Sequence, residues 1–199
     1  MLDKSVPFFG VLMTKNDMKT YPRFMLPAGY SFSGYRPGDE TVWADLMFCL
    51  EQTESLTEAR QIFQTEFLAR LDCLERQCLF VLDDQGRVAA TASLWYGSHF
   101  GREQPRIHWV AADPAYQGRG LVKALLTRLL DVYHALGFKD GLYLTTQTWS
   151  YKAINLYRQF GFEPYLGERP LNWDGSDFEA DNQTAWAIIE SKIADYKIR

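Results

Sequence analysis

A glycine-rich turn, Gln117-Gly118-Arg119-Gly120, separates an apolar stretch from a long amphipathic one. Glycine has no side chain to shield the backbone, and the first N–H groups of a helix lack intrahelical partners. The amides of residues 118 to 122 could therefore approach an anion closely, and the helix dipole would favour its negative charge. The turn predicts a site for a phosphate or pyrophosphate, and the alternative is a tight connection that binds nothing.

Spacing separates this turn from two other phosphate-binding motifs. A Walker P-loop needs a glycine, four residues and then Gly-Lys-Ser or Gly-Lys-Thr, and no segment of the chain matches it. A dinucleotide fingerprint needs a third glycine where Lys123 stands and an acid at the end of the next strand, whereas Asp140 precedes that strand. The spacing therefore argues against a nucleotide-cofactor oxidoreductase.

Two segments together resemble a known family. Gln117-Gly118-Arg119-Gly120-Leu121-Val122 is similar to the acyl-CoA signature Gln/Arg-x-x-Gly-x-Gly/Ala of the GNAT superfamily of N-acetyltransferases, although Val122 departs from its final small residue. The segment Ala153-Ile154-Asn155-Leu156-Tyr157-Arg158-Gln159-Phe160-Gly161-Phe162 looks like the family's Ala-x-x-Leu-Tyr-x-x-x-Gly-Phe. The ordered pair is more specific than either segment alone, and the resemblance extends from about Cys78 to Tyr165.

The resemblance implies a fold class. It implies an α+β (α/β sandwich) GNAT fold, with a central mixed, mostly antiparallel twisted sheet of about six or seven strands flanked by about four helices. A chain of 199 residues is long enough for one domain with a substantial core. We therefore expect a single GNAT acetyltransferase domain over residues 1–199, with residues 1–30 as an N-terminal arm of uncertain structure.

The resemblance also implies an activity. In this family an amine attacks the thioester of acetyl-CoA directly, so we expect acetyl transfer to a primary amine of a small molecule or peptide; a non-catalytic acyl-CoA-binding or regulatory module on the same fold is the alternative. The strand backbone would lie beside the pantetheine arm, with an N–H near Val110 bonding the thioester oxygen. The residues expected to bind the cofactor are Trp109, Val110, Ala111, Gln117, Gly118, Arg119, Gly120, Leu121, Val122, Asn155 and Tyr157.

Four residues are candidates for proton transfer. Tyr157 stands where the family places a tyrosine that protonates the departing thiolate or holds its sulfur, and the alternative is a core residue with a surface hydroxyl. A thiol of pKa ~8.5 leaves as thiolate at a cost of only about 2 kcal/mol at pH 7, so this role is modest. Removing a proton from an amine of pKa ~10.4 costs roughly 4.6 kcal/mol, so a strongly basic acceptor needs a base. The candidate bases are His108 and, as weaker choices, Glu103 and Glu163; packing is the alternative role of His108.

The composition of the chain excludes several kinds of binding partner. A net charge of -4 and a pI near 5.4 argue against a nucleic-acid binder. The three cysteines lack the spacing of a zinc site or disulfide framework, which predicts no metal site and buried free thiols in a reducing compartment. The apolar run from Val6 to Met13 is too short and interrupted to be a signal peptide or membrane span. We expect a cytoplasmic monomer or homodimer without a membrane partner.

The periodicity of apolar residues predicts the elements that position these groups. Asp39 is a plausible N-cap for a helix through Leu50, and Ser55 with Glu58 forms a capping box for a second helix through Leu74. Aromatic residues that could be core or face an acceptor are Tyr35, Trp43, Phe48, Phe63, Trp95, Trp109 and Tyr143. Strands are predicted at 8–14, 30–35, 79–82, 88–96, 106–111, 141–146, 162–166 and 184–190, helices at 121–136 and 150–160, and a polar loop at 172–183.

Overall fold

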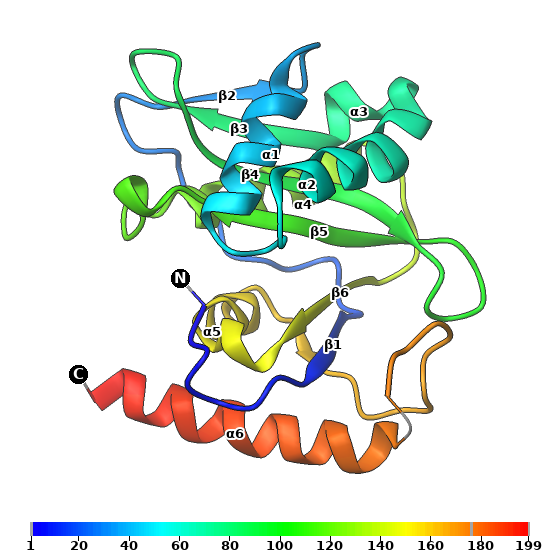
Figure 1. The fold of residues 1–199 in the computed structure, drawn as a ribbon. Helices are drawn as coiled ribbons and strands as arrows, with labels where there is room; N and C mark the ends of the chain where they lie inside the picture. The colour runs from blue at the N-terminus through cyan, green and yellow to red at the C-terminus, as the bar shows by residue number, and fades with distance from the viewer. Residues whose placement is uncertain (1, 176, 199) are drawn as a thin grey trace. The chain divides into compact units, whose positions relative to one another are not determined.

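The computed structural model describes residues 2–175 and 177–198, and the chain folds into two compact units (Figure 1). Unit 1 consists of Met1–Pro22, Tyr96–Arg106 and Lys139–Arg199, and unit 2 of Arg23–Trp95 and Ile107–Phe138. The prediction of a single domain stays a prediction.

Unit 2 contains antiparallel strands and four α-helices. Strand β2 (Ser31–Gly34) pairs with β3 (Cys78–Leu82), which pairs with β4 (Val88–Gly97), and β5 (Gln104–Ala112) is next in the order. The strands predicted at 79–82 and 88–96 are confirmed and form an antiparallel hairpin. The helices are α1 (Asp39–Cys49), α2 (Leu56–Ile62), α3 (Leu71–Gln77) and α4 (Leu121–Ala135). In Figure 1, α1 and α2 lie in front of β3 and β4, whereas α4 lies behind them.

Helix α4 follows its predicted bounds closely. Its apolar face packs against β3, and Leu125 and Leu129 are fully buried. Gly137, with a φ of +73°, ends the helix as predicted. The N–H groups of Gly137 and Phe138 donate to the carbonyls of His134 (3.0 Å) and Tyr133 (3.4 Å), which is the hydrogen-bonding pattern of a Schellman motif.

Unit 1 is built on the central strand β1 (Gly10–Lys15). This strand pairs antiparallel with β6 (Leu142–Gln147) on one side and β7 (Glu163–Pro164) on the other, and its residues Val11 to Met13 are fully buried. The first residues of β5 run parallel to β6, with Arg106 opposite Tyr143. Helices α5 (Tyr151–Gln159) and α6 (Phe178–Ile198) complete the unit. The N-terminal arm therefore contributes a strand to the core of unit 1.

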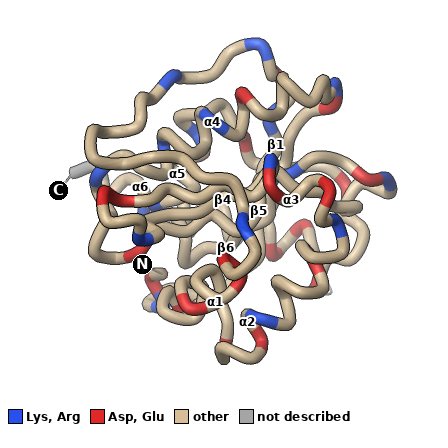
Figure 2. The backbone as a smooth tube through the Cα atoms, turned by 90° about the horizontal axis from the view of Figure 1, so that it is seen from above, with Lys and Arg blue, Asp and Glu red and all other residues tan. Residues whose placement is uncertain are grey.

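The mixed, mostly antiparallel pairing of seven strands with flanking helices confirms the predicted fold class. Among the described residues, no helix is both long and apolar enough to cross a bilayer, and no cluster of His, Cys, Asp or Glu could hold a metal ion. Figure 2 shows basic and acidic residues interspersed along the helices of unit 2. All three cysteines are free, but Cys49 is exposed, so the prediction of buried thiols holds for Cys78 and is wrong for Cys49.

Helix α6 overturns the prediction for the C-terminal segment. The sequence predicts a loop over 172–183 and a strand over 184–190, but the helix begins at Phe178 and packs against β1 and α5. Its buried residues recur at helical spacing, at Asn182, Ala185, Trp186, Ile189 and Ile193. The predicted strand covers only seven residues, which is too short to distinguish helical spacing of apolar residues from strand alternation. The burial pattern along the whole of α6 shows that the segment is helical.

The predicted helix from Ser55 to Leu74 is not continuous. Helix α2 is followed by a π-helical turn (Phe63–Phe67), a 3-10 turn (Leu68–Arg70) and α3. The wider π-helical turn shifts the buried face, so Phe63, Phe67 and Leu74 are buried whereas Leu71 is 63% exposed. Tertiary packing, rather than helix periodicity, sets this break.

The predicted N-cap of α1 is also wrong. The N-cap is Gly38 in the left-handed conformation, one residue before the predicted cap, Asp39. The Asp39 carboxylate instead accepts a hydrogen bond from the N–H of Arg36 at 2.8 Å. It therefore stabilises the preceding turn, while the helix begins without a side-chain cap.

Candidate functional site

The glycine turn lies at the start of α4 in unit 2. Gly118 and Gly120 have φ values of +77° and +79°, and a Cβ atom added to either would meet no atom within 4 Å. Glycine is therefore required by the left-handed backbone, and the space above both residues is open. The Gln117 side chain donates to the carbonyl of Ala112 at 3.1 Å, which ties the turn to the end of β5.

The backbone amides of this turn have no acceptor in the part of the chain that the structure describes. The first backbone hydrogen bond at the helix start runs from the Ala124 N–H to the Gly120 carbonyl at 3.1 Å, so the amides of residues 118 to 122 precede it. No side chain caps the helix, and its first turn contains no acidic residue. Bare N–H groups at the positive end of a 15-residue helix suit an anion such as a diphosphate.

Arg119 braces the turn from outside. Its guanidinium donates to the Tyr30 hydroxyl at 2.7 Å and to the Ala115 carbonyl at 3.0 Å, and it lies 5.3 Å from the centre of the Tyr116 ring. These contacts hold the side chain against its own unit. A role of Arg119 in phosphate binding stays a prediction.

Strand β5 is distorted at Trp109, which has a φ of +47° within the strand. A left-handed residue other than glycine costs about 1–2 kcal/mol, and it turns the neighbouring peptide group out of the regular hydrogen-bonding direction. The N–H near Val110, predicted to bond the thioester oxygen, directly follows this distortion. A strained strand residue of this kind is typical of functional sites.

The distortion brings two consecutive side chains onto one carboxylate. In a regular strand His108 and Trp109 would point to opposite faces. Here the His108 Nε2 lies 2.5 Å from Glu66 Oε2, and the Trp109 Nε1–H donates to the same oxygen at 3.1 Å. A charge-assisted hydrogen bond of this type contributes about 1.5–3 kcal/mol, which is enough to offset the strain at Trp109.

Sequence reasoning missed Glu66. It lies in the π-helical turn, 42 residues before His108, and only the tertiary structure brings the two side chains together. The aromatic rings around Glu66 form one connected set. The ring centres of Trp43 and Trp109 lie 5.3 Å apart in an edge-to-face contact, and those of Phe67 and Trp95 lie 4.8 Å apart. A wide π-helical turn in the middle of a predicted helix is the signal that points to the site.

The remaining predicted residues belong to unit 1. Tyr157 on α5 is buried, and burial raises the pKa of its hydroxyl above the ordinary value, so the hydroxyl stays protonated at neutral pH and is a weaker acid than an exposed tyrosine. Asn155 on the same helix is half-buried. Glu103, immediately before β5, and Glu163 on β7 are exposed. The catalytic and cofactor-binding roles of these residues stay predictions.

A profile of the acetyltransferase (GNAT) family matches residues 41–162, more than half of the chain. The chain belongs to this family. The match covers the glycine turn, the distorted strand and Tyr157. Family membership confirms the predicted resemblance to this family.

Individual proteins that are similar to this GNAT chain are also named acetyltransferases. It is 31% identical over 139 residues to glucosamine 6-phosphate N-acetyltransferase of Trypanosoma brucei brucei, covering 66% of this chain and 90% of that protein. It is 41% identical over 71 residues to N-alpha-acetyltransferase RimI of Mycobacterium tuberculosis, covering 33% and 41%. A GCN5-related N-acetyltransferase from Sphaerobacter thermophilus shares the fold, with a TM-score of 0.63 and 20% identity over 79% of this chain.

The GNAT chain spans only part of several of these proteins. It covers 41% of RimI and 49% of the Sphaerobacter thermophilus chain. The likeness to the solved structure concerns the fold, whereas the names of the relatives describe those proteins.

The aromatic candidates separate by burial. Tyr35, Trp43, Phe63, Trp95 and Tyr143 are buried, Trp109 is half-buried and Phe48 is exposed. Burial raises the pKa of the Tyr35 hydroxyl to about 12, and its hydroxyl donates to Glu40 at 2.8 Å. Tyr35 therefore acts as a structural residue that ties β2 to α1.

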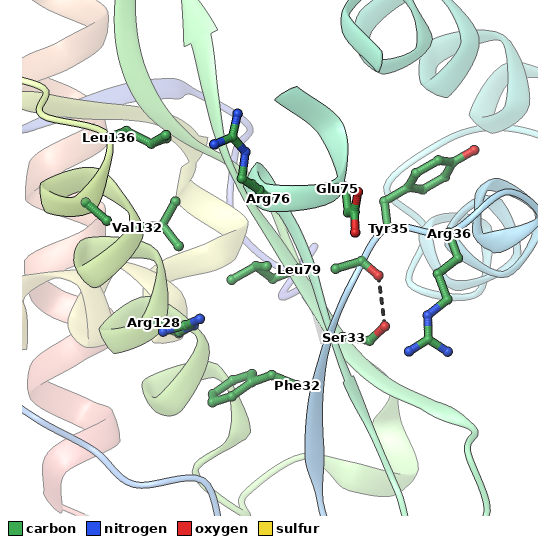
Figure 3. Close-up of a pocket in the computed structure, with 12 residues that line it drawn as sticks. Phe32, Ser33, Tyr35, Arg36, Glu75, Arg76, Leu79, Arg128, Val132 and Leu136 are labelled. Atoms are coloured by element: carbon green, nitrogen blue, oxygen red, sulfur yellow. Dashed lines mark hydrogen bonds between the residues drawn. The ribbon is translucent and has the colours of Figure 1, made fainter. Parts of the chain in front are cut away.

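A separate cavity of about 460 Å³ lies in unit 2 away from the glycine turn (Figure 3). Figure 3 shows Leu79 between Arg76 and Arg128, and the residues of α4 that it labels, Arg128, Val132 and Leu136, lie beyond the first turn of that helix. None of the residues predicted to bind the cofactor or transfer a proton lines this cavity, and of the aromatic candidates only Tyr35 does. The cavity therefore does not belong to the candidate active site.

Proposed function

We propose that this chain transfers an acetyl group from acetyl-CoA to a primary amine by direct attack of the amine on the thioester. The observation that carries the proposal is the row of open amides above Gly118 and Gly120, which supplies a diphosphate site in a chain of the acetyltransferase family. In this proposal the diphosphate of acetyl-CoA binds at the glycine turn, and its thioester lies near the distorted part of β5.

The backbone of β5 and the hydroxyl of Tyr157 take the two chemical roles in this proposal. The amide near Val110 donates to the thioester oxygen as it becomes negative, which is the interaction that strengthens in the transition state. Tyr157, whose hydroxyl is protonated at neutral pH as an ordinary tyrosine is, supplies a proton to the leaving thiolate. Since a thiolate leaves at a cost of only about 2 kcal/mol at pH 7, replacing Tyr157 with phenylalanine slows the reaction without abolishing it.

An assay of thiol release against a panel of primary amines tests the proposal. Turnover that requires both acetyl-CoA and an amine supports it, and calorimetry of CoA binding is run beside it. No turnover with any amine, with CoA still bound, would favour the non-catalytic acyl-CoA-binding module. Tyr157→Phe is expected to lower kcat with little change in the acetyl-CoA KM, and the reverse pattern would make Tyr157 a binding residue.

The relatives support an amine as the acceptor, because one is named for glucosamine 6-phosphate and another for N-alpha-acetylation. We propose a cytoplasmic location because Cys49, Cys73 and Cys78 form no disulfide, as expected in a reducing compartment. Size-exclusion chromatography with light scattering decides between a monomer and a homodimer.

A further inference from the structure

The carboxylate of Glu66 is held by two irregular elements that meet in unit 2. It lies on the π-helical turn Phe63–Phe67, and it accepts the indole N–H of the left-handed residue Trp109 at 3.1 Å. The same oxygen lies 2.5 Å from His108 Nε2. Two departures from regular geometry on different elements thus serve one functional group, which indicates that the position of the carboxylate matters.

The surroundings of this carboxylate are aromatic. The backbone carbonyl of Glu66 accepts the indole N–H of Trp95 at 3.2 Å, and Phe67 contacts both Trp95 (4.8 Å) and His108 (5.9 Å). Trp43 is fully buried against Trp109, and its Nε1 has no hydrogen-bond partner in the described part of the chain. The Glu66 side chain nevertheless stays 35% exposed, so a ligand can reach it.

A carboxylate beside aromatic rings suits one kind of ligand. The carboxylate attracts an ammonium group, ring faces attract the same positive charge, and ring edges pack against carbon. The indole N–H of Trp109 stabilises the ionised form of the carboxylate. A second anion is disfavoured next to Glu66, whereas a cationic amine with an apolar group near its nitrogen fits.

We propose that Glu66 binds the ammonium group of the acetyl acceptor and, together with His108, receives its proton. The inference rests on the proposed N-acetyltransferase function and deepens it. It predicts an acceptor class, namely a primary amine that is cationic at neutral pH and carries an apolar or aromatic group next to the nitrogen. Glu66 lies at the level of the β5 distortion, where the thioester oxygen is expected.

The proton balance of this step is complete. One proton passes from the ammonium nitrogen to the Glu66–His108 pair, and the neutral amine forms a bond to the acetyl carbonyl carbon. As the C–S bond breaks, the second amine proton is lost from nitrogen and the thiolate is protonated, which leaves the amide and CoA thiol. The pair then returns its proton to water, so no oxidant or metal is needed.

Calorimetry on protein saturated with CoA tests the binding part of the proposal. Benzylamine carries the positive charge and benzyl alcohol is its neutral counterpart of similar shape. Wild type is expected to bind benzylamine about tenfold or more tightly than benzyl alcohol, a preference worth about 1.4 kcal/mol. Glu66→Gln should abolish this preference, and the matched control Glu75→Gln, an exposed carboxylate on α3, should retain it. Equal preference in Glu66→Gln and wild type would overturn the proposal.

A turnover series tests the proton-accepting part. Glu66→Gln should lower kcat/KM about tenfold or more for ethylamine, but much less for trifluoroethylamine, because the fluorinated amine is already neutral at pH 7. Equal losses for both amines would indicate a purely structural role and overturn this part. Failure of wild type to turn over any amine would overturn the proposed function, whereas the calorimetric preference still decides whether Glu66 binds the cation.

Discussion

Helices α2 and α4 begin in opposite ways. At α2 the Ser55 hydroxyl accepts the N–H of Glu58 at 3.1 Å, and the Glu58 carboxylate accepts the N–H of Glu54 at 2.6 Å. At α4 the N-cap is Gly120, and neither a side-chain cap nor an acidic residue occupies the first turn. One helix satisfies its amides with its own side chains, and the other leaves them open, as the proposed diphosphate site requires. The difference distinguishes a structural helix start from a binding one.

The largest effect is expected from the ligand itself. CoA at about 100 times its dissociation constant should raise the free energy of unfolding by about 2.7 kcal/mol, because it binds the folded turn and not the unfolded chain. Thermal and denaturant unfolding with and without CoA measure this change. An unchanged unfolding midpoint at saturating CoA would show that the bare amides of α4 do not serve this ligand.

Giving α4 an acid of its own should weaken cofactor binding. Gly120→Glu places a carboxylate beside the expected diphosphate and should raise the acetyl-CoA KM about tenfold or more, which corresponds to about 1.4 kcal/mol. Gly120→Gln is the matched control, since it brings the same left-handed strain at φ +79° without the charge. The glycine turn is removed from the cofactor site if Gly120→Glu leaves KM unchanged.

Removing the cap of α2 should affect stability alone. Ser55→Ala leaves the Glu58 N–H without its acceptor and should lower the free energy of unfolding by about 1 kcal/mol. Denaturant unfolding measures the loss, and Ser55→Thr, which keeps a hydroxyl, should restore most of it. A change in the acetyl-CoA KM of Ser55→Ala would contradict the separation of the two helix starts.

The smallest change, in the free energy of unfolding, is expected when Glu58 is replaced. Glu58→Gln removes a negative charge from the positive end of α2 but keeps an oxygen that can accept the Glu54 N–H, so the loss should be about 0.3–1 kcal/mol. The salt dependence of unfolding identifies this charge contribution, since added salt should reduce the difference in free energy of unfolding between Glu58→Gln and wild type. A difference that does not depend on salt would point to the hydrogen bond instead.

The elements that depend on local pattern could be predicted from the sequence. The capping box at Ser55, the hairpin between β3 and β4, and helix α4 with its terminal Gly137 all follow from residues close together in the chain. Helix α6 could not be predicted, because the apolar residues near Trp186 fit both a helical and a strand period. Only its packing against β1 in the structure distinguishes them. The π-helical turn at Phe63–Phe67 likewise depends on packing.

The candidate site divides in the same way. The sequence by itself predicted the glycine turn, because glycine adopts a positive φ without steric cost, and both Gly118 and Gly120 have one in the structure. Anion binding at this turn stays a prediction. The sequence also indicated His108 as a candidate, but not its partner. Only the tertiary structure decided that Glu66 meets His108 and Trp109, because a contact between side chains 42 residues apart depends on how a distorted strand and a widened helical turn pack together.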